Sequence, residues 1–255
     1  MTRLDTPAAR WTFAVLAHAG LVLAWYLFVE IGRVPKFVMP SPQATLAALF
    51  VPDYAWGTNL AVTATEIFGG YFLALAVGVL LALVFTWSRP LEAIFLPLLV
   101  TLNMIPKVAL GPLIIVWFKY GVFPNTLMAF SIAVFPILLT TARGLREVEP
   151  ELLDLVRSLR GSRWQLFVKI QLPGALPYIF SGMKVASILA VAGAVVGEFL
   201  GSDKGLGYLM LQVQVTLDTP AMFMAVILIT MLGMLLYGLV LLLERWLVVR
   251  DARLA

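Results

Sequence analysis

Charge and cysteine are what this sequence has least of. Only 13% of its 255 residues are charged, 62% are apolar, one is His and none is Cys. An ordinary soluble domain has about a quarter charged residues, so water is not the solvent for most of this surface. The lack of Cys excludes disulfides and thiol catalysis, and a single His18 leaves almost nothing for a transition-metal site. We therefore expect a membrane protein that holds no metal.

Long apolar stretches, by contrast, are abundant. A helix needs about 20 mainly apolar residues to cross the hydrocarbon layer, and six such stretches with their connections use nearly all of the chain. The predicted fold is all-α, a single transmembrane domain over residues 1–255 with about six spanning helices. The expected spans are 11–31, 58–86, 91–118, 123–141, 175–200 and 221–249.

The placement of basic residues orients these spans. When they are threaded from an N-terminus in the cytoplasm, thirteen of the 18 Lys and Arg residues fall on the cytoplasmic side. Lys and Arg concentrate in the cytoplasmic loops of membrane proteins. The sequence thus predicts a multi-pass protein with both termini in the cytoplasm.

Residues 143–173, between the fourth and fifth spans, form the one long charged segment. Pro150 suits the first turn of a helix there. Four apolar residues then recur at steps of three and four, which places them on one helix face. They are Leu152, Leu155, Val156 and Leu159. We expect this amphipathic helix to lie at the membrane surface, to be broken by Gly161 and Ser162, and the segment to end at Leu172-Pro173 before the next span.

The spacing within this segment resembles the EAA loop of bacterial ABC-importer permeases, E-A-A-x3-G-x9-I-x-L-P. The corresponding residues are Asp154-Leu155-Val156, then Arg160, Ile170 and Leu172-Pro173. Asp stands in place of Glu, and Arg160 stands in place of Gly, with Gly161 one position later. Further stretches resemble the nitrate/sulfonate/taurine branch of these permeases. They are Met39-Pro40-Ser41-Pro42, Ile105-Pro106 through Trp117-Phe118, Phe135-Pro136, Gly197-Glu198-Phe199 and Gly205-Leu206-Gly207.

The resemblance implies a permease of the type I ABC importer fold in the bacterial inner membrane. Its partners would be a second copy of itself, a separate ABC ATPase and an extracytoplasmic solute-binding protein. The 150–173 loop would dock into the ATPase through Asp154, Leu155, Val156, Arg157, Leu159, Arg160, Gly161, Arg163, Trp164, Leu172 and Pro173. The alternative interpretation of the same residues is an amphipathic helix that rests on anionic lipid headgroups.

The chain lacks the means to use ATP itself. The phosphate-loop pattern G-x-x-x-x-G-K-[ST] does not occur in the sequence,. We therefore expect a transport subunit that is no enzyme and binds no cofactor directly, with ATP and Mg on the partner ATPase. No nucleic-acid partner is expected either.

Ionisable residues within spans are costly and usually face a cavity or a partner. Glu66 and Lys107 lie at nearly the same depth in the second and third predicted spans, at about 1.5 Å per residue. Either a structural ion pair between them or a contact with substrate fits this placement. Asn103 and the helix break at Pro106 predict that the third span lines the pore. Glu198, at the outer end of the fifth span, fits an external gate and the membrane interface equally well.

Two other functional classes compete with an ATP-driven permease. A self-contained secondary carrier or channel is the alternative, but such carriers often show paired repeats with broken helices in corresponding halves, and the sequence shows no such pair. A membrane enzyme would need a His, Cys or carboxylate cluster, which the sequence also lacks. The resembled branch imports nitrate, sulfonates, taurine and pyrimidine-type vitamin precursors. Gly197-Glu198-Phe199 and residues 217–220 favour the pyrimidine-precursor group.

Overall fold

The protein is all-α in the computed structural model, which describes residues 7–147 and 150–248. No strand occurs in these ranges, which confirms the predicted fold class. The α-helices are α1 (Pro7–Ile31), α2 (Pro42–Ala48), α3 (Trp56–Trp87), α4 (Arg89–Met104), α5 (Gly111–Phe118), α6 (Val122–Arg146), α7 (Pro150–Ser158), α8 (Arg163–Leu166), α9 (Leu172–Gly201), α10 (Leu206–Val215) and α11 (Thr219–Leu247). Short 3-10 turns cover Pro52–Tyr54 and Lys107–Leu110, and a π-turn covers Phe167–Gln171.

Four segments of the described chain are long and apolar enough to cross a membrane. They are Pro52–Trp87, Val122–Arg146, Arg163–Gly201 and Thr219–Leu247. The first three contain the second, fourth and fifth predicted spans, and the last covers residues 221–247 of the sixth. α1 carries a shorter apolar stretch, Val15–Ile31. The count of six spans stays a prediction.

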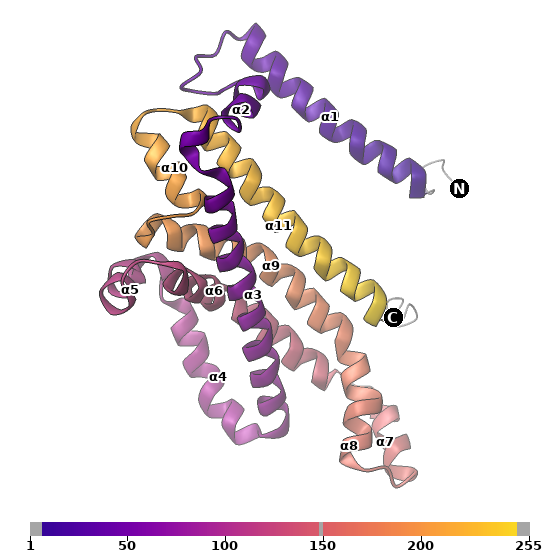
Figure 1. Ribbon diagram of the computed structural model, residues 1–255. Coiled ribbons are helices and arrows are strands. Elements are labelled where there is room, and N and C mark those ends of the chain that lie inside the picture. Colours follow the sequence, from indigo (N-terminus) through magenta and orange to yellow (C-terminus); the bar gives the residue numbers. More distant parts are fainter. Residues whose placement is uncertain (1–6, 148–149, 249–255) are drawn as a thin grey trace. The chain divides into compact units, whose positions relative to one another are not determined.

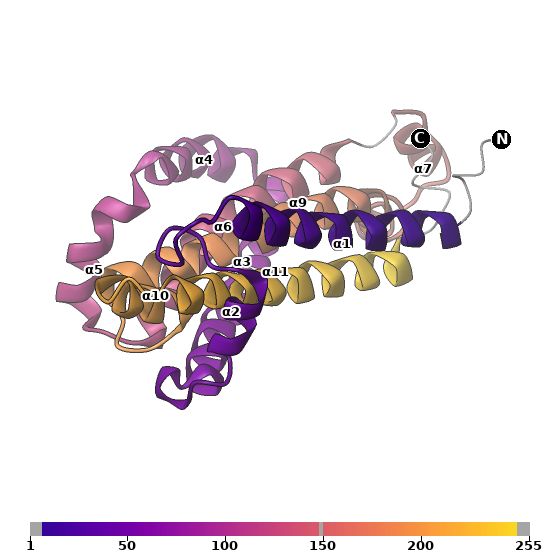
Figure 2. The same ribbon diagram turned by 90° about the horizontal axis from the view of Figure 1, so that it is seen from above.

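The third predicted span, 91–118, is not one continuous helix (Figure 2). α4 ends at Met104, Ile105 has an extended conformation with ψ 124°, and α5 begins only at Gly111. Pro106 causes the break, because its ring disfavours helical backbone in the preceding residue. The predicted break at Pro106 thus lies between α4 and α5, and the short 3-10 turn Lys107–Leu110 follows it.

The described chain divides into two compact units, which we treat separately. The first unit comprises the residues up to Trp56 together with Leu209–Leu228, and the second comprises Gly57–Tyr208 together with the residues from Ile229 on. The assignment of one transmembrane domain to residues 1–255 stays a prediction.

Tryptophans hold the Pro-rich 32–57 region inside the first unit. The indole of Trp25 donates to the carbonyl of Pro40 at 3.0 Å and stacks on the ring of Phe223. The indole of Trp56 donates to the carbonyl of Ala48 at 3.0 Å. The short helix α2 lies in this region and begins with the side chain of Ser41 as its N-cap,.

Small residues let α6 and α9 pack closely in the second unit (Figure 1). A Cβ atom at Gly193 would lie 2.7 Å from the Cα of Ala129, so only Gly fits there. The neighbouring residues on both helices are small and fully buried. They are Ala133 on α6, and Ala186, Ala190 and Ala194 on α9. Inside a membrane such small-residue faces allow the backbones to approach, which gives helix pairs their dispersion and hydrogen-bond contacts.

Candidate functional site

The α7–α8 segment, residues 150–173, contains the predicted amphipathic helix as α7. The leucines of its apolar face, which continues to Leu159 just after the last residue of α7, remain uncovered: Leu155 is 53% exposed and Leu159 is 74% exposed. The side chain of Arg157, which the resemblance assigns to docking, lies outside the described residues. A row of exposed leucines on a short helix is a surface suited to a partner.

The helix α7 ends in a left-handed residue, and that residue is Arg160 with φ +55°. The N–H of Gly161 donates to the carbonyl of Val156 at 2.8 Å, five residues back, as in a Schellman cap,. Because α7 ends at Ser158 and α8 begins at Arg163, Gly161 and Ser162 lie in the break between the two helices, as the sequence predicts. Arg160 occupies the Gly position of the EAA pattern, and this position has the conformation that Gly adopts most easily.

Replacing Arg160 by Gly should stabilise this turn. An L-residue in the left-handed region costs about 1 kcal/mol, so we expect local opening of the C-terminal end of α7 to become about fivefold rarer. Hydrogen exchange at the Gly161 amide measures this opening. Gly161→Ala is the matched control and should accelerate exchange, because a Cβ there would lie 2.6 Å from the Cγ1 of Val156. Unchanged exchange in Arg160→Gly would contradict the strain at this position.

Ser162 restarts the chain as α8 through a capping box. Its hydroxyl accepts from the N–H of Gln165 at 3.2 Å, and its own N–H donates to the Gln165 side chain at 2.8 Å,. The ring of Trp164 lies 5.8 Å from that of Phe167, which lies 5.6 Å from Trp87 at the end of α3. These aromatic contacts attach α8 to α3, while Trp164 stays 65% exposed.

At Leu172-Pro173, where the sequence predicts the end of the segment, the chain passes into α9, which begins at Leu172. The N–H of Leu172 donates to the carbonyl of Phe167, five residues back, which makes a π-turn. Pro173 then sits in the first turn of α9, where its missing N–H removes no essential bond,. α8 therefore continues through the π-turn into α9, and the two form one segment that is long and apolar enough to cross a membrane,.

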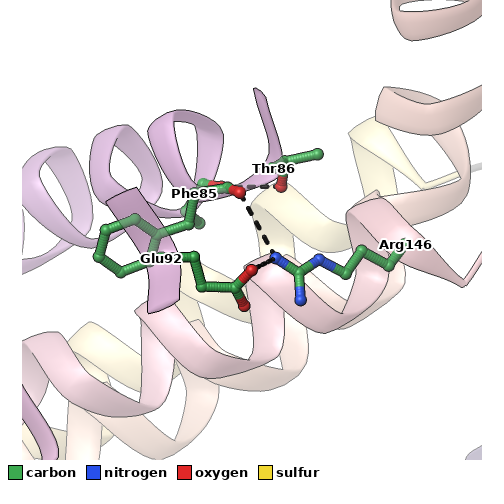
Figure 3. Close-up of polar contacts among 5 residues, drawn as sticks. Phe85, Thr86, Glu92 and Arg146 are labelled. Atoms are coloured by element: carbon green, nitrogen blue, oxygen red, sulfur yellow. Dashed lines mark hydrogen bonds and ion pairs between the residues drawn. The ribbon is translucent and has the colours of Figure 1, made fainter. Parts of the chain in front are cut away.

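At the other end of the segment, Arg146 fastens α6 to the turn between α3 and α4 (Figure 3). Its guanidinium forms an ion pair with Glu92 of α4 and donates to the carbonyl of Phe85 in α3 at 3.4 Å. Glu92 could not be identified from the sequence, because nothing in the sequence shows that the start of α4 meets the end of α6.

The last turn of α6 also borders a cavity of about 460 Å³ between α3, α4 and α6. Arg143 donates to Glu147 there at 3.0 Å, and this bond lowers the pKa of the Glu147 carboxyl below its ordinary value. Both side chains are exposed, so the pair contributes little to stability,.

The predicted pathway residues fall into two groups. Glu66 and Glu198 are fully buried in the second unit, and a side-chain amide of Asn125 donates to Glu66 at 2.9 Å. The side chain of Lys107 instead donates to the carbonyl of Leu102 at 3.0 Å, so the structural ion pair with Glu66 does not form. Asn103 and Pro106 are exposed around the break between α4 and α5, and their role in lining a pore stays a prediction.

The described residues, 7–147 and 150–248, include one His and several carboxylates that could in principle bind a metal ion. No group of three or more His, Cys, Asp or Glu side chains is placed to hold a metal ion in these ranges. The absence of a metal stays an expectation.

The described chain has long apolar helices, and the charged segment between two of them carries an exposed amphipathic helix. This combination fits a membrane transport permease. Residues 74–249 match the family described as "Binding-protein-dependent transport system inner membrane component", and the chain belongs to this family. It is an integral inner-membrane permease of the ABC importer type, as the resemblance predicted.

Several relatives match most of the chain. A "Probable ABC transporter permease protein" of Haemophilus influenzae is 36% identical over 85% of this chain and 89% of its own length. The riboflavin transport system permease protein RibX of Chloroflexus aurantiacus is 36% identical over 91% of this chain and 87% of its own. The formylaminopyrimidine transport permease protein ThiX of Halalkalibacterium halodurans is 31% identical over 84% and 86%.

A solved structure confirms the fold. The MetNI methionine ABC transporter, in inward-facing conformations, aligns with a TM-score of 0.53 at 19% identity, over 71% of this chain and 93% of that one. The type I importer permease fold is thus shown for this chain.

Proposed function

We propose that this chain is the pore-forming subunit of an ATP-driven importer and that a separate ABC ATPase grips its α7–α8 segment. The observation that carries the proposal is the uncovered apolar face of α7, with Leu155 and Leu159 more than half exposed. Exposed leucines followed by Arg160 and Arg163 suit a groove that is apolar at its centre and acidic at its rim. ATP and Mg bind the partner, and the permease itself catalyses no reaction.

The contacts around the segment explain how a pull on α7 reaches the membrane. On one side, α8 is attached to α3 through the rings of Phe167 and Trp87 and runs into α9 without a break. On the other side, Arg146 connects the end of α6 to α4, the helix that leads to the break at Pro106. Packed helices with polar links transmit a displacement as rigid bodies.

Two copies of the chain form one pathway in this proposal, and both termini lie in the cytoplasm. The support is the small number of long apolar segments, since four such segments enclose little space for a solute and its gates. The interrupted α4–α5 region lines the pathway, because exposed backbone at membrane depth is tolerated where it borders water. An extracytoplasmic binding protein delivers the solute from the opposite side.

The substrate we propose is a pyrimidine-type vitamin precursor. Two relatives carry names of nitrogen heterocycles, formylaminopyrimidine and riboflavin, at 31% and 36% identity over most of this chain. Relatives named for aliphatic sulfonates are 29% and 30% identical. Equilibrium binding of formylaminopyrimidine, taurine, an aliphatic sulfonate and nitrate to the partner binding protein discriminates among the candidates, and tight binding of a sulfonate alone would contradict this assignment.

Transport in reconstituted vesicles tests the proposed mechanism. With the ATPase inside and the binding protein outside, we expect uptake only when ATP and Mg are supplied to the ATPase side. The permease alone should bind no ATP, and a collapsed ion gradient should leave uptake unchanged. Uptake that persists without the ATPase and follows an ion gradient would instead establish a secondary carrier.

A further inference from the structure

Glu66 and Glu198 lie together in a buried polar cluster of the second unit. Their side chains are 0% and 1% exposed, and Asn59, Thr63 and Asn125 are buried with them. The cluster joins α3, α6 and α9 to the turn that precedes α10. Two carboxyl groups this close inside an apolar bundle cannot both be ionised at low cost. The hydrogen-bond donors around each of them show which one carries the charge.

Glu198 is surrounded by donors. The hydroxyl of Thr63 donates to its Oε1 atom, the N–H of Gly207 donates to its Oε2 atom, and the N–H of Tyr208 also donates to it. The oxygen of the Thr63 hydroxyl accepts the N–H of Leu206 at 2.8 Å, which leaves the hydrogen of that hydroxyl to donate to Glu198. A carboxyl group with three donors is satisfied as a carboxylate.

Glu66 has the opposite surroundings. Its Oε1 atom accepts from the amide of Asn125 at 2.9 Å, but its Oε2 atom is buried and receives no hydrogen bond from the described residues. The carboxyl group of Glu198 lies within hydrogen-bonding reach of Glu66. Two carboxylates have no hydrogen to share, whereas an acid and a carboxylate form a strong bond. Among the described side chains, no Lys or Arg forms an ion pair with either group.

We propose that Glu66 is a protonated carboxylic acid that donates its hydrogen to the Glu198 carboxylate, so that the pair holds one proton and one negative charge. The bound proton completes the set of donors on Glu198. The N–H groups of Gly205, Leu206 and Gly207 all end on the cluster, on Asn59, Thr63 and Glu198. The proton on Glu66 is therefore part of what fastens the start of α10 to α3.

Three variants of the full chain, purified in detergent, test this assignment. Glu66→Gln keeps a donor toward Glu198 and should yield folded protein within about twofold of the wild type. Glu66→Leu has a similar volume and no donor, and Glu198→Gln turns an amide N–H₂ toward backbone donors. We expect on the order of tenfold less folded protein from each of these two, as for an unmade buried hydrogen bond to a charged group. Size-exclusion yield and thermal unfolding give the readout.

Infrared spectroscopy locates the proton itself. The spectrum of the wild type minus that of Glu66→Gln should contain the carbonyl band of a protonated carboxylic acid, which shifts when the sample is exchanged into D₂O. The proposal is overturned if this difference spectrum lacks the acid band, if Glu66→Leu folds as well as Glu66→Gln, or if Glu198→Gln is the better tolerated of the two amides. None of these readouts depends on the ATPase or on the substrate, so the assignment stands or falls separately from the proposed transport function.

Discussion

Replacing Leu155 and Leu159 together by Asp should release the ATPase from the permease and abolish ATP-driven uptake. Both side chains are exposed, Leu155 on α7 and Leu159 directly after its last residue, so the change costs the folded permease little,. In the complex, each Asp would be buried against an apolar groove, and the loss of two anchors of about 2 kcal/mol each weakens binding by about 1,000-fold. Affinity purification of the tagged variant measures the retained ATPase, and vesicle uptake measures the functional loss.

Ser158→Asp provides the matched control for this experiment. It adds one negative charge to the last residue of α7, against two in the double variant, but lies away from the leucine stripe, and its side chain is exposed. We expect it to copurify with the ATPase and to transport at nearly the wild-type rate. If the double Asp variant retained both the ATPase and uptake, the coupling role of α7 would be wrong. If it lost only its affinity for anionic vesicles, the lipid-headgroup interpretation would be preferred.

Gly193→Leu should prevent the second unit from folding. A Cβ at this position meets the backbone of Ala129 at 2.7 Å, and backbone cannot move aside as the end of a flexible side chain can. Overpacking of this kind costs about 3 kcal/mol, a large part of the stability of an ordinary domain. The measurement is the fraction of expressed protein that remains monodisperse in detergent, which should fall to a small fraction of the wild-type value.

The control for Gly193→Leu is Gly238→Leu in α11. No atom lies within 4 Å of a Cβ built on Gly238, and that residue is exposed. The same substitution there should leave the yield unchanged or slightly raised, since Leu is the better helix former. Equal losses at both positions would show that lost helical flexibility, not the α6–α9 contact, causes the effect.

Part of the candidate site could be predicted because its signal is local. The steps of three and four residues between Leu152, Leu155, Val156 and Leu159 are a property of the local sequence; α7 covers the first three, and Leu159 directly follows its last residue, Ser158. The break at Pro106 is local too, since a proline constrains its own neighbour. The left-handed conformation of Arg160 could not be predicted in this way, because the neighbouring Gly161 adopts that conformation more easily,.

The partners of the buried and charged side chains could not be predicted in this way. Equal depth in two neighbouring spans suggested a contact between Glu66 and Lys107, but depth does not fix the direction in which a helix face points. In the structure, Glu66 faces Asn125 and Glu198, whereas the side chain of Lys107 donates to the carbonyl of Leu102, five residues earlier in the chain. The pair of Arg146 with Glu92 likewise joins residues far apart in sequence.

The sequence by itself determined that this chain is an all-helical membrane permease with an amphipathic connection, because hydropathy, helical period and the spacing of a motif are properties of consecutive residues. Only the tertiary structure decided which helices touch and which polar atoms meet. The close approach of α6 and α9 and the acid pair of Glu66 and Glu198 depend on how rigid helices rotate and cross, and that is fixed by packing across the whole bundle.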